Sequence, residues 1–166
     1  MTARALAGAL VLVAGTAVSA QESDVIAPGA KVERLAGGFG FLEGPAADAD
    51  GALYFSDVVK ERIHRWSAET GVTTFRESTG RANGLRIDLD GTLLVCEMAN
   101  RQVTAIDQDG RLSVLADGFE GRRFNGPNDL WVDPKGGIYF SDPHYGPTET
   151  QEIKGNHVYY LAPDRQ

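Results

Sequence analysis

The chain contains an internal repeat, and this repeat constrains the fold more than any other feature of the sequence. Segments 43–57, 83–97 and 128–142 can be laid over one another, with offsets of 40 and then 45 residues. Each copy has an acid five places in, a glycine eight places in, an apolar residue ten places in and an acid at its end. These residues are Asp48, Asp88 and Asp133; Gly51, Gly91 and Gly136; Leu53, Leu93 and Ile138; and Asp57, Glu97 and Asp142. A period of about 40 to 45 residues with several short strands per unit is typical of β-propeller blades.

Each copy is predicted to form short antiparallel strands joined by tight turns. The first copy predicts strands over 45–49, 52–56, 62–66 and 72–76; the second over 84–88, 92–96, 101–106 and 111–116; the third over 129–133, 137–141 and 157–161. Asp50-Gly51 marks a hairpin, because glycine readily adopts the positive φ that such a turn requires. Glycine accounts for 20 of the 166 residues without a triplet period. This composition favours a turn-rich β architecture over a collagen-like one.

The sequence therefore predicts an all-β fold, a β-propeller of about two and three-quarter blades. We expect the partial propeller to occupy residues 32–166, with blades over approximately 32–80, 81–124 and, incomplete, 125–166. Propellers typically close with about four to eight blades, so we expect the chain to be the first part of a longer, truncated protein. The alternative is a complete small β protein, since a domain of this size can bury a core.

The N-terminal segment has the pattern of a secretory signal peptide. Residues 1–20 carry one charge, Arg4, followed by an apolar run that ends in Val18-Ser19-Ala20. This pattern predicts cleavage after Ala20 and a periplasmic or secreted protein, with a linker over 21–31. The apolar run is shorter than the roughly 20 residues of a transmembrane helix, so no stable membrane anchor is expected.

The charge of the chain argues against a nucleic-acid partner, and its cysteine content excludes an internal disulfide. The chain has 16 basic and 23 acidic residues, a net charge of −7, and no basic cluster that could follow a phosphate backbone. A nucleic-acid partner is therefore not expected. Cys96 is the only cysteine, so no internal disulfide can form, and its apolar surroundings predict a buried, inert thiol. The sequence does not indicate an oligomeric state.

The strand directions bring three oxygen-bearing side chains to one rim. In an antiparallel pair, the first strand starts at the edge where the second ends, so Glu43, Asn83 and Asn128 should share a rim near the channel axis. Carboxylate and amide oxygens suit a hard divalent cation, Ca²⁺ first, then Mg²⁺ or Mn²⁺. The alternative is that the two asparagines only cap turns and that Glu43 is a solvated loop acid.

Several motifs resemble one known family. They are Leu42-Glu43-Gly44-Pro45, Leu53-Tyr54-Phe55-Ser56-Asp57, Ala82-Asn83-Gly84-Leu85, Leu94-Val95-Cys96-Glu97, Phe124-Asn125-Gly126-Pro127-Asn128-Asp129-Leu130 and Ile138-Tyr139-Phe140-Ser141-Asp142-Pro143. Together they are similar to the gluconolactonase, senescence marker protein and luciferin-regenerating enzyme family, over essentially all of residues 33–161. The resemblance implies a six-bladed propeller with a divalent cation in its channel, commonly calcium with Zn²⁺ a further alternative, and hydrolysis of sugar lactones.

The resemblance also implies roles for single residues. Glu43 corresponds to the first metal ligand, and Asn128 is either a second ligand or a substrate contact. Asp129 is expected beside the ligands or in contact with substrate, and Asn83 in contact with substrate. His144 is a further candidate substrate contact, because its loop follows a strand that ends at the predicted functional rim. Trp131, on an inner strand, is expected in the core.

The remaining ligands, and the aspartate proposed as catalytic base, come from later blades in the family. They lie beyond residue 166, so the catalytic residue is unknown here and the fragment alone is expected to be inactive. The implied reaction is metal-dependent attack of water on a small lactone. The chain has neither G-x-S-x-G nor H-E-x-x-H, so serine-hydrolase and zinc-protease functions lack their motifs. Two alternatives are a phosphotriester hydrolase on the same scaffold and a non-catalytic binding propeller with a structural ion.

Overall fold

The structure is a computed structural model that describes residues 26–165. The predicted signal peptide at 1–20 lies outside the described residues, as does the first half of the predicted linker. The chain divides into two units, residues 1–34 and residues 35–166, and every described strand belongs to the second unit. Within the described residues, no helix is long and apolar enough to cross a membrane.

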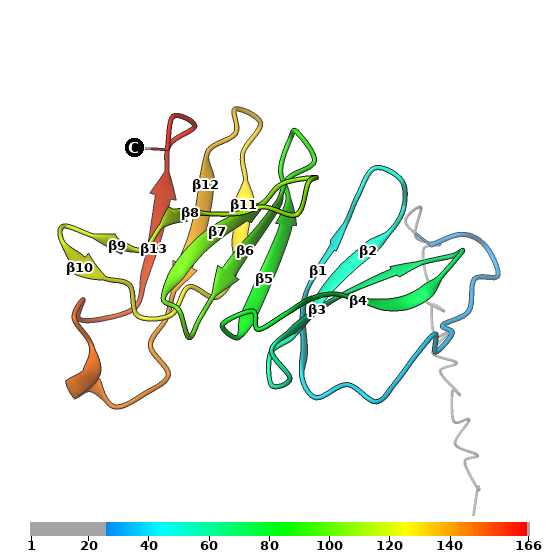
Figure 1. Cartoon of the computed structure of the whole chain (residues 1–166), viewed down its shortest axis with the longest axis horizontal. Helices are drawn as coiled ribbons and strands as arrows, with labels where there is room; N and C mark the ends of the chain where they lie inside the picture. The colour runs from blue at the N-terminus through cyan, green and yellow to red at the C-terminus, as the bar shows by residue number, and fades with distance from the viewer. Residues whose placement is uncertain (1–25, 166) are drawn as a thin grey trace, which may run out of the picture. The chain divides into compact units, whose positions relative to one another are not determined.

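The second unit consists of antiparallel sheets that follow one another along the chain (Figure 1). Blade one contains β1 (Leu42–Ala47), β2 (Leu53–Asp57), β3 (Arg62–Ser67) and β4 (Gly71–Glu77). Blade two contains β5 (Ala82–Ile87), β6 (Leu93–Glu97), β7 (Gln102–Ile106) and β8 (Leu112–Ala116). Blade three contains β11 (Leu130–Val132), β12 (Ile138–Asp142) and β13 (His157–Leu161). Strands pair in chain order within each blade, which confirms the predicted all-β partial propeller.

In all three repeats the N–H of the glycine donates to the backbone carbonyl oxygen of the acid at the hairpin turn, and in blades one and three the side chain of this acid stabilises the turn as well. In blade one the side chain of Asp48 accepts hydrogen bonds from the N–H groups of Asp50 at 3.0 Å and Ala52 at 2.8 Å. Gly51 completes this turn with a φ of 83°. The equivalent Asp133 in blade three accepts from Lys135 and Gly137 in the same way. The Asp-x-x-Gly spacing is therefore repeated because each blade needs the same tight turn.

The first strands of blades one and two begin earlier than predicted, and the structure contains one hairpin that was not predicted. β1 begins at Leu42, three residues earlier than predicted, and its pairing with β2 shifts register between Glu43 and Ala46. Such an irregularity inserts an extra residue into one strand and interrupts the alternation of its side chains, so a regular strand pattern does not predict it. A small hairpin of β9 (Gly118–Phe119) and β10 (Arg122–Arg123) was not predicted. Positive φ at both Glu120 and Gly121 forms its turn, and glutamate is not a usual signal for that conformation.

The blades pack through two apolar layers that meet on β6. Leu93 and Val95 face the layer shared with blade one, whereas Leu94 and Cys96 face the layer shared with blade three. Because both faces of β6 are buried, its first four residues, 93–96, are continuously apolar instead of alternating. Cys96 is fully buried and free, and burial raises the pKa of its thiol well above the usual value. The prediction of a buried thiol is confirmed.

The prediction that Trp131 belongs to the core is wrong. Trp131 is 49% exposed, whereas its neighbours Leu130 and Val132 are each 8% exposed. Successive side chains of a strand point to opposite faces, and the buried neighbours occupy the face toward blade two. Trp131 therefore lies on the other face of blade three, where its ring is 6.0 Å from that of Tyr139.

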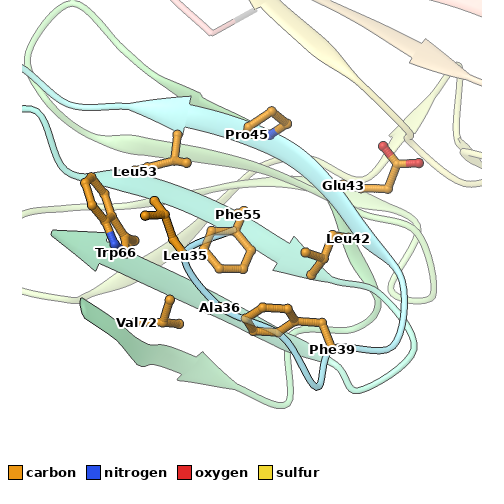
Figure 2. Close-up of a pocket in the computed structure, with 10 residues that line it drawn as sticks. All are labelled: Leu35, Ala36, Phe39, Leu42, Glu43, Pro45, Leu53, Phe55, Trp66 and Val72. Atoms are coloured by element: carbon orange, nitrogen blue, oxygen red, sulfur yellow. The ribbon is translucent and has the colours of Figure 1, made fainter. Parts of the chain in front are cut away.

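Blade one also has an apolar outer face, which forms a groove (Figure 2). Residues of the segment before β1 and of all four strands line it: Leu35, Ala36, Phe39, Leu42, Pro45, Leu53, Phe55, Trp66 and Val72. Among the residues that the structure describes, Glu43, at the margin of the groove, is the only charged lining residue. This groove therefore lacks the several polar groups that a catalytic site requires.

Candidate functional site

Four of the five predicted site residues line a single cavity of about 370 Å³. They are Glu43 at the start of β1, Asn83 on β5, and Asn128 and Asp129 just before β11. The three strand starts share a rim because each first strand runs antiparallel to the second, with Leu42 opposite Asp57 and Ala82 opposite Glu97. The structure thus brings these side chains together, while their chemical roles stay predictions.

Glycines allow the inner strands to approach closely at the cavity. A Cβ on Gly44 would lie 2.2 Å from the carbonyl oxygen of Asn83, and a Cβ on Gly84 would lie 2.6 Å from the Cα of Asp129. Contacts this short leave no room for a side chain. Gly44 and Gly84 directly follow Glu43 and Asn83, so the same two-residue unit supplies a polar side chain and the close backbone contact beside it.

Hydrogen bonds then join neighbouring blades at the same place. The N–H of Gly84 donates to the carbonyl oxygen of Asn128 at 2.7 Å. The hydroxyl of Ser56, on β2, donates to the carbonyl oxygen of Asn83 at 2.7 Å and to that of Glu43 at 3.0 Å. Sequence reasoning missed Ser56, although a signal was present: Ser56, Cys96 and Ser141 occupy the same repeat position, 13 residues after Glu43, Asn83 and Asn128 respectively.

The polar side chains of the cavity differ in whether they form hydrogen bonds within the protein. Among the residues that the structure describes, neither the carboxylate of Glu43 nor the side-chain amide of Asn128 forms a hydrogen bond or salt bridge. Asn83 is 7% exposed, and its amide nitrogen donates to the sulfur of Met98 at 3.0 Å. Asp129 accepts a hydrogen bond from the N–H of Leu130 at 2.8 Å. Glu43 and Asn128 are therefore the groups whose oxygens are available to a ligand.

The acids that end each repeat have a different function from the residues of the cavity. Asp57 and Asp142 are fully buried. Asp57 accepts hydrogen bonds from the N–H groups of Gly40 at 2.7 Å and Phe41 at 3.2 Å. Burial alone would raise the pKa of Asp57, but these backbone donors, with the N–H and charge of Lys60, lower it below the usual value. Asp57 therefore stays ionised and anchors the segment that enters β1.

Asp142 has the same function in blade three, and Glu97 a related one in blade two. Asp142 accepts from the N–H groups of Asn125 at 2.9 Å and Gly126 at 2.7 Å. Glu97 instead accepts from the side chains of Asn100, Gln102 and Thr104. All three carboxylates are directed into the protein, so none of them is a candidate base for the cavity.

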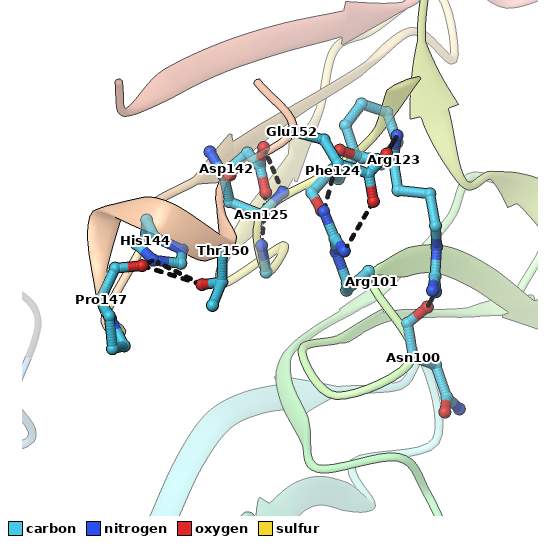
Figure 3. A network of polar contacts seen from close by, with 11 residues as sticks. Asn100, Arg101, Arg123, Phe124, Asn125, Asp142, His144, Pro147, Thr150 and Glu152 are labelled. Carbon is cyan, nitrogen blue, oxygen red and sulfur yellow. Dashed lines mark hydrogen bonds and ion pairs between the residues drawn. The ribbon is translucent and has the colours of Figure 1, made fainter. Parts of the chain in front are cut away.

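His144 does not line the cavity. It lies in the loop between β12 and β13, where its N–H donates to the side-chain oxygen of Asn156 at 2.9 Å. Its ring nitrogen Nε2 is 2.8 Å from the carbonyl oxygen of Pro147 and 3.3 Å from the hydroxyl of Thr150 (Figure 3). The structure thus places the ring among residues of its own loop, and its predicted contact with substrate stays a prediction.

An ion-pair network that sequence reasoning did not find holds this loop against blade two (Figure 3). Arg101, in the turn after β6, forms a salt bridge with Glu152 at 3.0 Å and donates to the carbonyl oxygen of Phe124. The N–H of Arg123 donates to Glu152 at 2.9 Å. This backbone donor, together with the charge and hydrogen bond of Arg101, lowers the pKa of Glu152. Arg101 and Glu152 are 51 residues apart in the chain. A single contact of this kind leaves no periodic pattern in the sequence from which it could be predicted.

The donors of the cavity fit a hard cation in type. Within residues 26–165, no three His, Cys, Asp or Glu side chains gather as a metal cluster. The cavity instead offers the carboxylates of Glu43 and Asp129 and the amide oxygens of Asn83 and Asn128. Oxygen donors without thiol or imidazole match the preference of Ca²⁺ and Mg²⁺.

Comparisons with known proteins agree with this architecture. The family described as SMP-30/Gluconolactonase/LRE-like region matches residues 41–166. A gluconolactonase of Zymomonas mobilis is 32% identical over 153 residues, which cover 80% of this chain and 43% of that protein. Lactonase drp35 of Staphylococcus aureus is 29% identical over 130 residues, which cover 74% of this chain and 38% of that protein.

Solved structures give the same result for the fold. A gluconolactonase from Xanthomonas campestris is 33% identical and superimposes with a TM-score of 0.72, over 77% of this chain and 46% of that chain. The present chain spans less than half the length of each of these three relatives. The family match nevertheless covers the three blades and the whole candidate site, and the chain therefore belongs to the SMP-30/gluconolactonase/LRE-like family.

Proposed function

We propose that the full-length protein hydrolyses a small sugar lactone at the cavity formed by the three inner strands. One observation carries this proposal: Glu43, Asn83, Asn128 and Asp129, from three blades, line a single cavity. Two relatives support the reaction class, since one is named a gluconolactonase and the other a lactonase.

Glu43 and Asn128 are the residues that would hold a divalent cation. Their side-chain oxygens have no partner among the described residues, and both line the cavity. Ca²⁺ is our first choice for this oxygen-donor set, with Mg²⁺, Mn²⁺ and Zn²⁺ as alternatives. When bound, the cation would polarise the carbonyl oxygen of the lactone.

The other cavity residues would bind and orient the substrate. Because the amide nitrogen of Asn83 already donates to Met98, its amide oxygen is left to accept a hydrogen bond from a sugar hydroxyl. The second carboxylate oxygen of Asp129 can accept another. No described residue is assigned as the base that activates water, because Asp57, Glu97 and Asp142 are engaged inside the protein.

Hydrolysis of gluconolactone by the full-length protein tests this proposal. Activity should be present with Ca²⁺, fall to background in excess chelator and return when Ca²⁺ is restored. A panel of other lactones and one phosphotriester, assayed under the same conditions, would assign the substrate class. Absence of chelator-sensitive hydrolysis of every lactone would contradict the proposal, and binding of Ca²⁺ without any turnover would favour a non-catalytic propeller with a structural ion.

We also propose that the protein is exported, on the basis of the apolar segment that ends at Ala20. The N-terminus of the mature protein should then be Gln21. Mass spectrometry of protein recovered from the periplasm and from the medium would test both the cleavage site and the compartment. A full-length N-terminus in the cytoplasmic fraction would contradict export.

A further inference from the structure

The two junctions between neighbouring inner strands use the same acceptor but different donors. In each junction, the acceptor is the backbone carbonyl oxygen of the asparagine that starts the later blade. At the junction of blades two and three, the N–H of Gly84 donates to Asn128 at 2.7 Å. At the junction of blades one and two, the hydroxyl of Ser56 donates to Asn83 at 2.7 Å. At the junction of blades one and two, the hydroxyl of Ser56 thus takes the place of the backbone N–H that donates at the junction of blades two and three.

Ser56 also contacts the other site residue of its junction. Its hydroxyl lies 3.0 Å from the carbonyl oxygen of Glu43, which is opposite it on β1. A hydroxyl has one hydrogen, which is therefore shared between the carbonyl groups of Glu43 and Asn83. Ser56 is fully buried, so water does not compete for this hydrogen.

The regular sheet ladder is interrupted beside Glu43. The pairing of β1 with β2 is irregular between Glu43 and Ala46. Gly44 has a φ of 55°, and Pro45 has no N–H to donate. The regular sheet ladder therefore does not hold the residues that follow Glu43, and the Ser56 hydroxyl bonds to the chain where the ladder is interrupted.

The repeat supplies two internal comparisons. Cys96 stands at the position of Ser56 in blade two, is fully buried, and carries a thiol, which is a weak donor. Ser141 stands there in blade three and accepts from the N–H of Asp129 at 3.1 Å, within its own blade. Of Ser56 and Cys96, the two equivalent side chains that have a following blade beside them in the structure, only Ser56 donates a hydrogen bond across the junction.

We propose that Ser56 is a positioning residue of the site, whose hydroxyl holds the backbones of Glu43 and Asn83 in a fixed relation so that their side chains act on one ligand. This inference rests on the proposed function, in which Glu43 holds the cation and Asn83 orients the substrate. Ser56 acts through these two residues, since it is not among the residues that line the cavity.

The test compares Ser56→Ala, Ser56→Cys and Ser56→Thr with Cys96→Ala in the full-length protein. Cysteine keeps the shape of serine with a slightly larger thiol that is a weak donor, and threonine keeps the hydroxyl. Cys96→Ala alters a buried residue at the same repeat position that has no hydrogen bond between blades. Amide hydrogen exchange without metal is measured over 42–47 and 82–87, Ca²⁺ affinity by calorimetry, and kcat and KM on gluconolactone.

Ser56→Ala and Ser56→Cys should accelerate exchange in both segments and weaken Ca²⁺ binding about three- to tenfold, as for loss of one net hydrogen bond. Ser56→Thr should restore both, and Cys96→Ala should change neither. The proposal would be overturned if exchange over 82–87 were unchanged in Ser56→Ala and Ser56→Cys. It would also be overturned if Cys96→Ala accelerated this exchange as much as they do. If the wild-type protein neither binds Ca²⁺ nor hydrolyses a lactone, the proposed function fails, whereas the exchange data still decide whether Ser56 aligns the two strands.

Discussion

The N–H of Gly84 donates to the carbonyl oxygen of Asn128 at 2.7 Å, so that the inner strands of blades two and three are joined backbone to backbone. The same glycine has the Cα of Asp129 2.6 Å from where its Cβ would be. Close packing and hydrogen bonding therefore coincide at the residues that line the candidate site. The site geometry depends on inter-blade contacts as much as on the side chains themselves.

Substitution of this glycine should separate the two blades. Gly84→Ala places a methyl group against backbone atoms of residues 128 and 129, which cannot move aside like a side chain. We expect a loss of about 1–3 kcal/mol in the free energy of unfolding, measured by urea denaturation. Gly126→Ala is the matched control, because its added Cβ would meet nothing closer than 3.6 Å. Equal stability of the two variants would contradict the close approach.

The carboxylate of Asp57 should contribute stability that depends on pH. Its pKa is lowered in the folded protein, so its contribution is fully present above the unfolded pKa, about 3.9, and is lost as pH falls through the lower folded value. Asp57→Asn removes one of the two acceptor oxygens that bind backbone N–H groups. We expect Asp57→Asn to lower the free energy of unfolding at pH 7 by about 1–3 kcal/mol.

Unfolding curves between pH 7 and pH 3 would measure this effect. The difference between wild type and Asp57→Asn should shrink as the pH falls below 4, because the wild-type carboxylate becomes protonated. Asp109→Asn, on an exposed turn, serves as the control with no expected change. A difference that stays constant over the whole range would contradict the role of the ionised carboxylate.

Glu43→Gln should weaken cation binding without unfolding the protein. The substitution removes a charged oxygen donor that has no other partner among the described residues, so the change should affect the ligand and not the packing. We expect Ca²⁺ affinity to fall at least about tenfold, as for loss of a charged ligand contributing ~1.4 kcal/mol or more. Calorimetric titration of the full-length protein measures it.

Glu77→Gln is the corresponding control, since Glu77 pairs with Arg62 on the outer strands of blade one, at 3.0 Å, and does not line the cavity. Its Ca²⁺ affinity should equal that of wild type. Glu43 would lose its assignment as a ligand if both variants bound Ca²⁺ as tightly as wild type.

Glu152→Gln should loosen the loop between β12 and β13. The charged side chain accepts hydrogen bonds from Arg101 and from the N–H of Arg123, and a neutral amide would weaken both. Hydrogen exchange over residues 143–156 should accelerate, while exchange over β12 stays unchanged. Glu149→Gln, in the same loop, should have no effect, because the Glu149 side chain forms no hydrogen bond or salt bridge with the described residues. Acceleration by both substitutions would show that the loop responds to charge in general.

The repeat is the reason that so much of this fold could be predicted. Equivalent residues such as Asp48 and Asp133 recur because each blade needs the same hairpin turn, and a local requirement leaves a local pattern. The strand starts that carry Glu43, Asn83 and Asn128 could be assigned to one cavity because antiparallel pairing determines which strand ends share a rim. The resemblance to the lactonase family pointed to the same residues.

Features that depend on one particular contact could not be predicted. The β9–β10 hairpin and the salt bridge of Arg101 with Glu152 each occur once among the described residues. Its place on an inner strand predicts a core position for Trp131, but only its neighbours Leu130 and Val132 face blade two.

The sequence by itself determined the period, the hairpin turns, the apolar character of β6 and the residue types gathered at the rim, because each of these follows from spacing along one strand or turn. Only the tertiary structure decided which acids face the cavity and which anchor backbone N–H groups. It alone also showed that a serine hydroxyl joins two blades where the sheet ladder is interrupted. The physical reason is that hydrogen-bond partners and close contacts between blades depend on distances across the sheets, which residue order does not encode in any periodic form.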